Sequence, residues 1–133
     1  MKNSSKYLPH KGAKCSRCRE EASICLPAHR ACFCPECFVR YFENAVSRGI
    51  KKMKWDRQEH LMVAVSGGKD SLATWQALHE LGLNTQGLFI NLQIDNFSQK
   101  SRETVQKFAE QRGLDWTEFE LKTELGYTIP ELH

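Results

Sequence analysis

Short apolar runs and segments of helical periodicity alternate along the second half of the chain. Residues 61–65 form an apolar run, which predicts a buried strand. Apolar side chains then recur every three or four positions, the spacing of one face of a helix, at Leu72, Trp75, Leu78 and Leu81. The residues between them, 66–71, are therefore predicted to form a strand-to-helix turn.

The same alternation continues toward the C-terminus. Residues 86–92 predict a second strand, and a helix capped by Ser98 or Ser101 is predicted to end at Gly113. Three apolar residues predict a third strand: Trp116, Phe119 and Leu121. Strands that alternate with helices of these lengths favour right-handed crossovers, and so an α/β fold with a parallel sheet.

The first half contains one predicted helix between polar and basic segments. This helix is predicted to start near Pro35 and to fade before Gly49. Five residues share its apolar face, which we interpret as a packing surface: Phe38, Tyr41, Phe42, Ala45 and Val46. Residues 1–13 predict a flexible tail, and residues 49–60 form a basic connector.

All six cysteines lie between positions 15 and 37, so they serve one local module. Two Cys-x-x-Cys pairs, separated by 15 residues, have the spacing of a four-cysteine zinc site: Cys15, Cys18, Cys34 and Cys37. A closed four-ligand site leaves no position for substrate. The zinc is therefore predicted to be structural and to supply much of the folding energy of a small module.

Other arrangements of the cysteines stay open at this level. Cys32 and Cys34 could shift the ligand register, and His10 or His29 could replace a thiolate. An iron–sulfur cluster or a set of disulfides would also use closely spaced cysteines, and the role of Cys25 is unassigned. Disulfides fit poorly with the absence of a secretion signal in the sequence.

The turn after the first predicted strand combines two glycines with a Ser-Lys-Asp-Ser cluster: Ser66, Gly67, Gly68, Lys69, Asp70 and Ser71. Free N–H groups at a helix start, the helix dipole and the Lys69 ammonium favour an anion, and glycine lacks the Cβ that would hold a phosphate away. A Walker A loop would need glycine where Val63 stands. The turn is a candidate phosphate site of another kind.

Charge divides the chain into two electrostatically different parts. The net charge of +3 combines +7 over residues 1–60 with −4 over residues 61–133. This asymmetry favours an N-terminal surface for nucleic acid joined to an acidic body, although a solvated basic helix has the same charges. No apolar run approaches about 18 residues, so we expect a cytoplasmic protein without a membrane segment.

The turn at 66–71 resembles the SGGxDS loop of the PP-loop ATP pyrophosphatases, which activate a substrate as its adenylate. Together with the cysteine pairs and linking helix, the chain from Cys15 onward resembles one group of that family, the ATP-dependent tRNA 2-thiouridine synthetases. Residues 87–91 match the strand under the adenine, and residues 126–132 match the segment leading to the group's catalytic Cys-x-x-Cys. The resemblance implies a zinc ribbon and linking helix before the first half of a parallel-sheet PP-loop domain.

The resemblance also implies a role for each matched residue. Four residues would hold the β and γ phosphates of ATP: Ser66, Gly67, Gly68 and Ser71. Lys69 would offset charge on the departing pyrophosphate, and Asp70 would orient Mg²⁺ or the phosphates. Ala64 and Ile90 would contact the adenosine.

In the implied reaction, the uridine O2 of a tRNA attacks the α-phosphate, and a sulfur donor then displaces AMP. A ubiquitin-like sulfur carrier protein is one such donor, and a homodimer is an assembly that the resemblance allows. The group's catalytic cysteines and iron–sulfur cluster have no counterpart in these 133 residues, because Cys25 and Cys32 lie in the zinc module. The chain therefore looks like an N-terminal fragment, and alone it is predicted to be inactive in sulfur transfer.

The predicted organisation is a flexible tail, a zinc-binding module, a helix with a basic connector, and half of a nucleotide-binding domain, at residues 1–13, 14–38, 39–60 and 61–133. Two other functions fit the same residues. One is a zinc-dependent RNA- or protein-binding module with a vestigial nucleotide site. The other is a PP-loop ligase or amidotransferase that acts on a small molecule.

Overall fold

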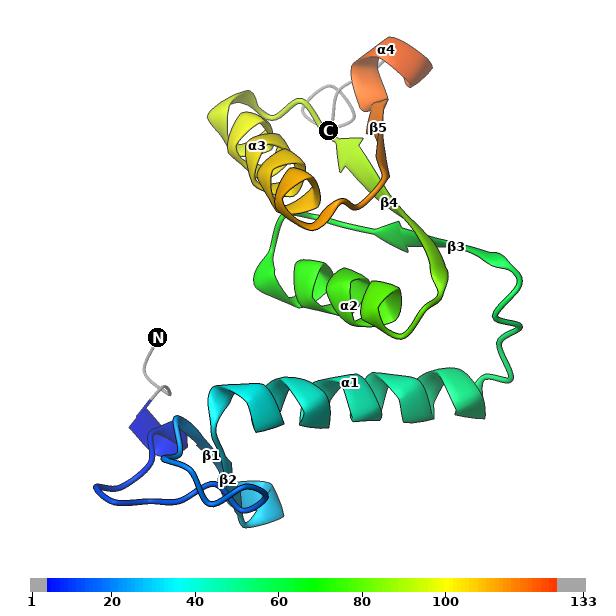
Figure 1. The fold of residues 1–133 in the computed structure, drawn as a ribbon. Coiled ribbons are helices and arrows are strands. Elements are labelled where there is room, and N and C mark those ends of the chain that lie inside the picture. Colours follow the sequence, from blue (N-terminus) through cyan, green and yellow to red (C-terminus); the bar gives the residue numbers. More distant parts are fainter. Residues whose placement is uncertain (1–4, 127–133) are drawn as a thin grey trace. The chain divides into compact units, whose positions relative to one another are not determined.

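The computed structural model describes residues 5–126, and the chain divides into two compact units between Arg48 and Gly49 (Figure 1). Residues 1–4, and residues 127–132 of the segment matched to the family, lie outside the described residues. The first unit contains the 3-10 turn Ser5–Tyr7, β1 (Ile24–Leu26), the 3-10 turn Pro27–His29, β2 (Ala31–Phe33) and most of α1 (Pro35–Lys52). The second contains β3 (His60–Ala64), α2 (Lys69–Glu80), β4 (Asn84–Asn91), α3 (Asp95–Arg112), β5 (Trp116–Glu120) and α4 (Leu121–Leu125).

The first unit is an antiparallel hairpin with α1 behind it. Strands β1 and β2 pair with Cys25 opposite Cys32, and these two cysteines form a disulfide. The ring of Phe33 is buried and stacks on Tyr41 of α1, with ring centroids 5.0 Å apart, while Phe38 lies 6.3 Å from it. The predicted packing role of the apolar face of α1 is thus confirmed for Phe38 and Tyr41.

Helix α1 is longer than the sequence predicts. It continues through Gly49 to Lys52 and does not fade before the glycine. A single glycine costs a helix interior about 1 kcal/mol but does not stop it, because all its backbone hydrogen bonds still form. The chain leaves the helical path at Lys54, whose φ of 55° lies in the left-handed region.

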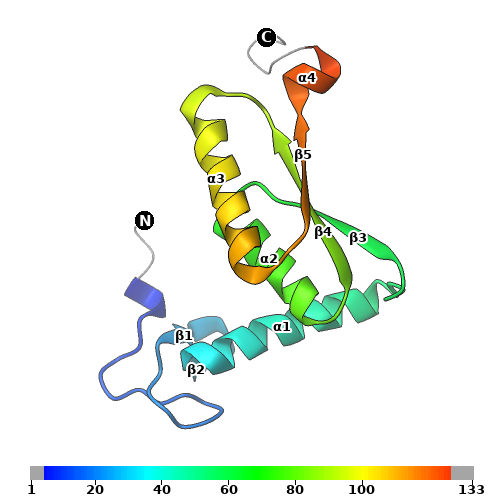
Figure 2. The same cartoon turned by 45° about the horizontal axis from the view of Figure 1, so that its top comes forward.

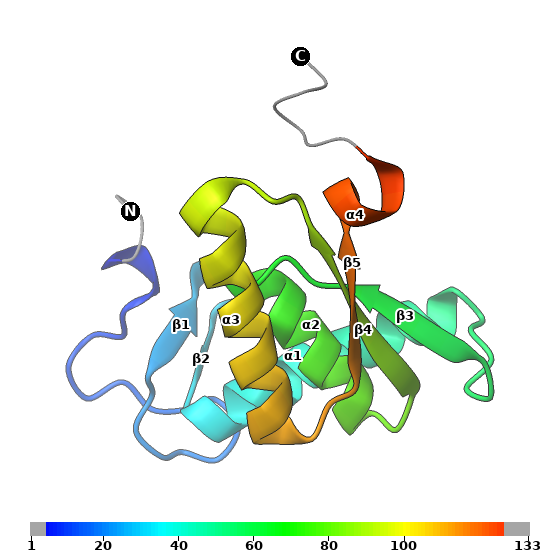
Figure 3. The same ribbon diagram turned by 90° about the horizontal axis from the view of Figure 1, so that it is seen from above.

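The second unit is built on a parallel sheet of three strands within residues 49–126, in the order β3-β4-β5. Helices α2 and α3 cover one face of it, as right-handed crossovers between successive strands require (Figures 1, 2 and 3). The core between sheet and helices consists of Val65, Leu72, Trp75, Phe89, Val105, Ala109 and Leu114. The predicted parallel α/β fold is confirmed.

The other face of the sheet carries apolar side chains that solvent reaches. Side chains alternate along a strand, so Val65 and Phe89 point toward the helices while Met62 and Ile90 point away. Met62 is 51% exposed and Ile90 is 45% exposed. No helix within residues 5–126 is long and apolar enough to cross a membrane.

Two predicted boundaries in this unit are wrong. Helix α3 begins at Asp95, before Ser98 and Ser101, and Ser98 is buried inside its first turns, where its Oγ accepts a hydrogen bond of 2.8 Å from the Ile94 N–H. Leu121 belongs to α4 and not to the third strand. The last strand pair joins Asn91 to Glu120, so no β4 residue remains to extend the ladder past Glu120.

Candidate functional site

Four cysteines of the first unit converge on one point. The Sγ atoms of Cys15, Cys18, Cys34 and Cys37 all lie within 4.8 Å of one another, and these four thiols are free. Three of them are buried and Cys18 is exposed. Four sulfurs at this separation can surround a single metal ion.

The hairpin holds the two cysteine pairs together. Ser16, inside the first pair, donates its backbone N–H to the Cys32 carbonyl at 2.8 Å, and its Oγ accepts the Cys32 N–H at 3.0 Å. The second pair follows β2 directly, so that Cys37 lies in the first turn of α1. Backbone N–H groups of Arg17 and Cys37 point at the sulfurs of Cys15 and Cys34, at 3.5 and 3.4 Å.

The four thiols cannot all ionise without a cation. Burial opposes ionisation of Cys15, but the N–H groups of Cys18, Cys34 and Arg17 lower its pKa to about 6. Hydrogen bonding with the Cys34 side chain, together with burial, raises the pKa of Cys37 to about 12. A divalent cation among the sulfurs would stabilise all four thiolates, so the donor set fits a metal ion.

The cluster has the composition that the cysteine spacing predicts. Cys32 is bonded to Cys25 and does not shift the ligand register. His29 packs edge-on against Tyr41, with ring centroids 5.9 Å apart, and neither it nor His10 belongs to the group of ligands among the described residues.

The glycine turn joins β3 to α2 and is held by its own serines. The Ser66 N–H donates to Ser71 Oγ at 3.2 Å, the Gly68 N–H donates to Ser66 Oγ at 3.2 Å, and Ser71 Oγ donates to the Gly68 carbonyl at 3.1 Å. Gly68 is the N-cap of α2 and offers no side-chain cap. The N–H groups of the first helical turn are therefore left for another acceptor, which favours an anion.

Gly67 allows the turn to approach α3. Its φ is +87°, and a Cβ at this position would lie 3.0 Å from the Ser101 carbonyl oxygen. Both the backbone conformation and the close contact require glycine. The sequence predicts the glycine-rich turn but not its neighbour, because Ser101 lies far along the chain.

Two hollows flank the turn. One, of about 350 Å³, is lined by the turn, the end of β4 and the start of α3: Ser66, Gly67, Gly68, Phe89, Ile90, Leu92, Phe97, Ser98 and Ser101. The other, of about 280 Å³, is lined by Ala64, Val65, Ser66, Ser71, Leu88, Ile90 and Leu92. Both join a polar end at the turn to apolar walls, which is the form of a site for a phosphate with an attached apolar group.

Some of the predicted site residues line a common hollow, and others do not. Ala64, Ser66, Ser71 and Ile90 share the second hollow. Lys69 lines neither hollow; its Nζ lies 2.8 Å from Asp70 Oδ1, and both side chains are 90% exposed. An exposed pair of this kind contributes little to stability, so both groups are available to a ligand at small cost.

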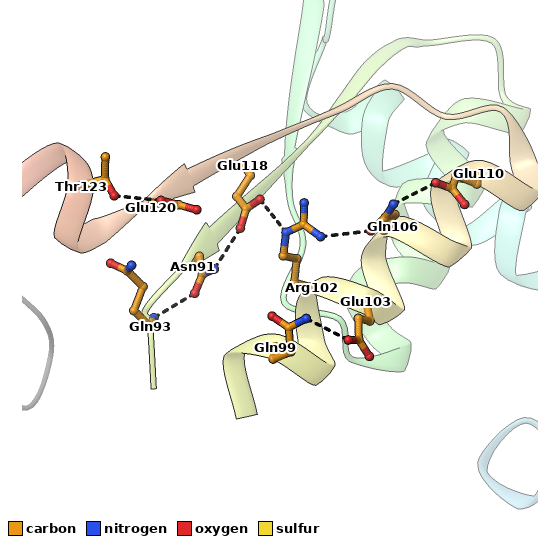
Figure 4. A network of polar contacts seen from close by, with 10 residues as sticks. All are labelled: Asn91, Gln93, Gln99, Arg102, Glu103, Gln106, Glu110, Glu118, Glu120 and Thr123. Carbon is orange, nitrogen blue, oxygen red and sulfur yellow. Dashed lines mark hydrogen bonds and ion pairs between the residues drawn. The ribbon is translucent and has the colours of Figure 1, made fainter. Parts of the chain in front are cut away.

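A polar network ties the end of β4 to α3 and β5 (Figure 4). Arg102 Nε donates to Glu118 Oε2 at 2.8 Å, and the Asn91 amide donates to Glu118 Oε1 at 2.9 Å. Gln93, whose φ is +56°, donates its N–H to Asn91 Oδ1 and accepts the Lys122 N–H on its Oε1. These contacts set the path of the segment after β4, which forms a wall of both hollows. Sequence reasoning missed the network because polar residues on helices and strands usually face water.

Comparison with known proteins gives one consistent result, although no protein-family model matches the chain. The tRNA-5-methyluridine(54) 2-sulfurtransferase of Thermus thermophilus is 37% identical over 119 residues, which are 89% of this chain and 37% of the relative. The enzyme of the same name from Pyrococcus horikoshii is 41% identical over 90% of this chain and 39% of its own length. The chain belongs to the tRNA thiolation family.

A member of the tRNA thiolation family also shares the fold. The structure of the U34-tRNA thiolase NcsA from Methanococcus maripaludis with its [4Fe-4S] cluster matches 86% of this chain and 40% of its own, with a TM-score of 0.75 and 23% identity. The chain thus spans less than two fifths of the length of the two sulfurtransferases described above.

Proposed function

We propose that this chain supplies the ATP-binding and tRNA-binding part of an enzyme that 2-thiolates a tRNA uridine through an adenylated intermediate. One observation carries the proposal. In a chain of this family, the turn at 66–71 leaves the N–H groups of a helix start free beside two hollows with apolar walls. Anion affinity next to an apolar space suits a nucleotide.

The residues of the turn divide the task of binding the nucleotide. The Ser66 hydroxyl and the first N–H groups of α2 bind the β and γ phosphates, and Ser71 joins them when its hydroxyl hydrogen turns from the Gly68 carbonyl to a phosphate oxygen. Lys69 offsets charge on departing pyrophosphate, and Asp70 binds or orients Mg²⁺, which when bound shields the phosphate oxygens. Ala64 and Ile90, which line one hollow, contact the adenosine.

The cysteine cluster holds zinc in this proposal. A Zn–S bond of about 2.3 Å in a tetrahedron requires sulfurs roughly 3.8 Å apart. The separations within 4.8 Å agree with a single ion, and Cys18 Sγ is 3.6 Å from Cys34 Sγ. A [4Fe-4S] cluster places several iron and sulfide atoms between its ligands and would need the cysteines farther apart. The zinc is structural, because its four protein ligands leave no open position.

Sulfur transfer lies outside the proposed task of these 133 residues. Their six cysteines form the cluster and the hairpin disulfide, so none is placed at the glycine turn. We expect the 133 residues alone to bind tRNA and ATP but not to thiolate tRNA. A sulfur donor, such as a sulfur carrier protein, would act on the adenylate with cysteines from elsewhere.

Titration with a non-hydrolysable ATP analogue and Mg²⁺ tests the nucleotide site. Lys69→Ala and Asp70→Ala each remove a charged group, and we expect the affinity to fall roughly ten- to a hundredfold. Lys107→Ala and Asp115→Ala are matched controls, because they remove exposed charges of the same unit that lie outside the glycine turn. Equal affinity for all four variants would contradict the proposal.

One observation favours the second candidate, a zinc-dependent RNA-binding module with a vestigial nucleotide site. Lys69 and Asp70 pair with each other and line neither hollow. The same titration separates the candidates, since a vestigial site predicts no response to the analogue while tRNA binding persists.

A further inference from the structure

The first unit contains a groove that neither the metal cluster nor the glycine turn uses. It has a volume of about 290 Å³ and lies between the end of the hairpin and the apolar face of α1. Its principal lining residues are Tyr7, Leu26, His29, Phe38, Tyr41 and Phe42. Five of its nine lining residues carry aromatic rings.

Two rings of the groove, those of His29 and Tyr41, are held by contacts with other rings. Tyr41 stacks on the buried Phe33 on one side and meets the edge of His29 on the other. Tyr7 is 39% exposed and His29 is exposed, so both present ring surface to solvent. Exposed rings in a groove suit a flat aromatic ligand, because a base can stack on them.

The positive charge of the first unit favours an anionic polymer as the ligand of the groove. Residues 1–48 contain nine Lys or Arg against four Asp or Glu, a net charge of +5. The Lys6 ammonium lies 4.9 Å from the centre of the Tyr7 ring, and Arg30 directly follows the turn that lines the groove. Arg40, exposed on α1, lies between two lining residues in sequence. An apolar protein segment would gain nothing from these cations, whereas phosphates beside a stacked base would.

We propose that this groove seats an unpaired nucleobase of the tRNA, with Tyr7 and His29 stacking on it and Lys6 and Arg30 contacting the adjoining phosphates. The proposal rests on the proposed function, since it assumes that the chain binds tRNA. The groove shares no lining residue with the two hollows at the glycine turn, and its proposed part is to hold the tRNA.

Fluorescence anisotropy with a labelled tRNA transcript and the zinc-loaded full chain tests this site. Tyr7→Ala and His29→Ala remove stacking surface, and we expect each to weaken binding between about five- and a hundredfold. Tyr7→Phe keeps the ring and should bind as the parent does. Val39→Ala is the matched control, because Val39 is 51% exposed on α1, which lines the groove, but is not itself a lining residue.

Salt dependence separates stacking from phosphate contacts. Tyr7→Ala should leave the slope of log affinity against log salt unchanged, because no charge is removed. Arg30→Gln should reduce that slope by roughly 0.7, the value for one phosphate contact on a single strand. A fully base-paired RNA duplex of similar length should not respond to Tyr7→Ala, because it has no base free to enter the groove.

The outcomes are distinct for the two proposals. If the parent chain does not bind tRNA, the proposed function fails and the groove fails with it. If the parent binds but the groove variants bind as tightly as Val39→Ala, only the groove is refuted. If the groove variants instead dissociate a dimer of the chain without loss of tRNA affinity, the groove is a contact between copies and our proposal is wrong. Unchanged circular dichroism and zinc content confirm that each variant is folded.

Discussion

At the scale of single residues, glycine is required at two positions of the second unit for different reasons. Gly67 has a φ of +87°, and a Cβ there would lie 3.0 Å from the Ser101 carbonyl oxygen of α3. Gly87 has ordinary backbone angles, but a Cβ there would lie 2.7 Å from the buried Trp75 ring. The first glycine shapes the candidate nucleotide site, and the second makes room for the largest side chain of the core.

Gly67→Ala tests the close approach of the turn to α3. We expect a loss of about 2–3 kcal/mol in the free energy of unfolding, from the unfavourable φ and the contact with Ser101. Gly82→Ala is the matched control, because Gly82 has a φ of +82° with nothing within 4 Å of a Cβ, and it should lose only about 1 kcal/mol. Urea denaturation measures both, and equal losses would show that the contact with α3 is unimportant.

The sequence alone predicts local features of single residues but not their contacts with residues distant in the chain. The turn at 66–71 is predicted because its glycines, serines and helix start are adjacent in sequence. The contact of Gly87 with Trp75, the partner of Gly67 and the ion pair of Arg102 with Glu118 depend on crossovers that bring distant residues together. Hydrophobic periodicity predicts that such crossovers exist but not which atoms meet.

At the scale of elements, strand and helix types were predictable and their ends were not. The apolar run at 61–65 and the periodicity after it correspond to β3 and α2. Helix α1 passes Gly49, and α3 starts three residues before Ser98, because hydrogen bonds of the folded chain decide where a helix ends. The intrinsic helix propensity of one residue changes the free energy of helix formation by only about 1 kcal/mol.

The passage of α1 through Gly49 gives a prediction of increased stability. A Cβ at Gly49 would meet nothing within 4 Å, and the residue lies within the helix. Gly49→Ala should therefore stabilise the protein by about 0.5–1 kcal/mol, since alanine loses less backbone entropy in a helix. Thermal unfolding followed by circular dichroism measures the gain. A loss of stability would show that α1 ends before this residue.

The network at the end of β4 should matter more than the ion pair on the glycine turn. Glu118→Ala leaves the Arg102 guanidinium and the Asn91 amide without their shared partner, and we expect a loss of about 1–3 kcal/mol. Asp70→Ala removes the exposed partner of Lys69 and should change stability by less than about 0.5 kcal/mol. Similar losses in urea denaturation would show that Glu118 does not link α3 to the sheet.

At the scale of the whole molecule, the two units have separate sources of stability. The first unit has a core of cysteines and a few aromatic rings, whereas the second has a continuous apolar core between sheet and helices. A structural zinc ion supplies on the order of 10 kcal/mol to a small domain, so with the proposed zinc the first unit should depend on the metal and the second should not.

Removal of the proposed zinc with a chelator should unfold the first unit alone. Trp55 donates its backbone N–H to the Ile50 carbonyl of α1, so the test uses a Trp55→Phe background. The remaining tryptophans, Trp75 and Trp116, lie in the second unit, so their fluorescence should stay unchanged while the four cluster thiols become reactive. Cys18→Ser should lose the metal, and Cys25→Ser, outside the cluster, should retain it. A change in tryptophan emission on chelation would contradict the independence of the second unit.

The bond between Cys25 and Cys32 makes the oxidation state of a sample a variable separate from its zinc content. A reductant that protects the cluster thiols also opens the cross-link of the hairpin. A thiol titration in denaturant, after the metal is removed, therefore counts four sulfhydryls for the cross-linked chain and six for the open one. Two preparations with the same zinc content can therefore differ in whether the hairpin is cross-linked. A tRNA affinity should be reported together with the zinc content and the number of free sulfhydryls of the sample.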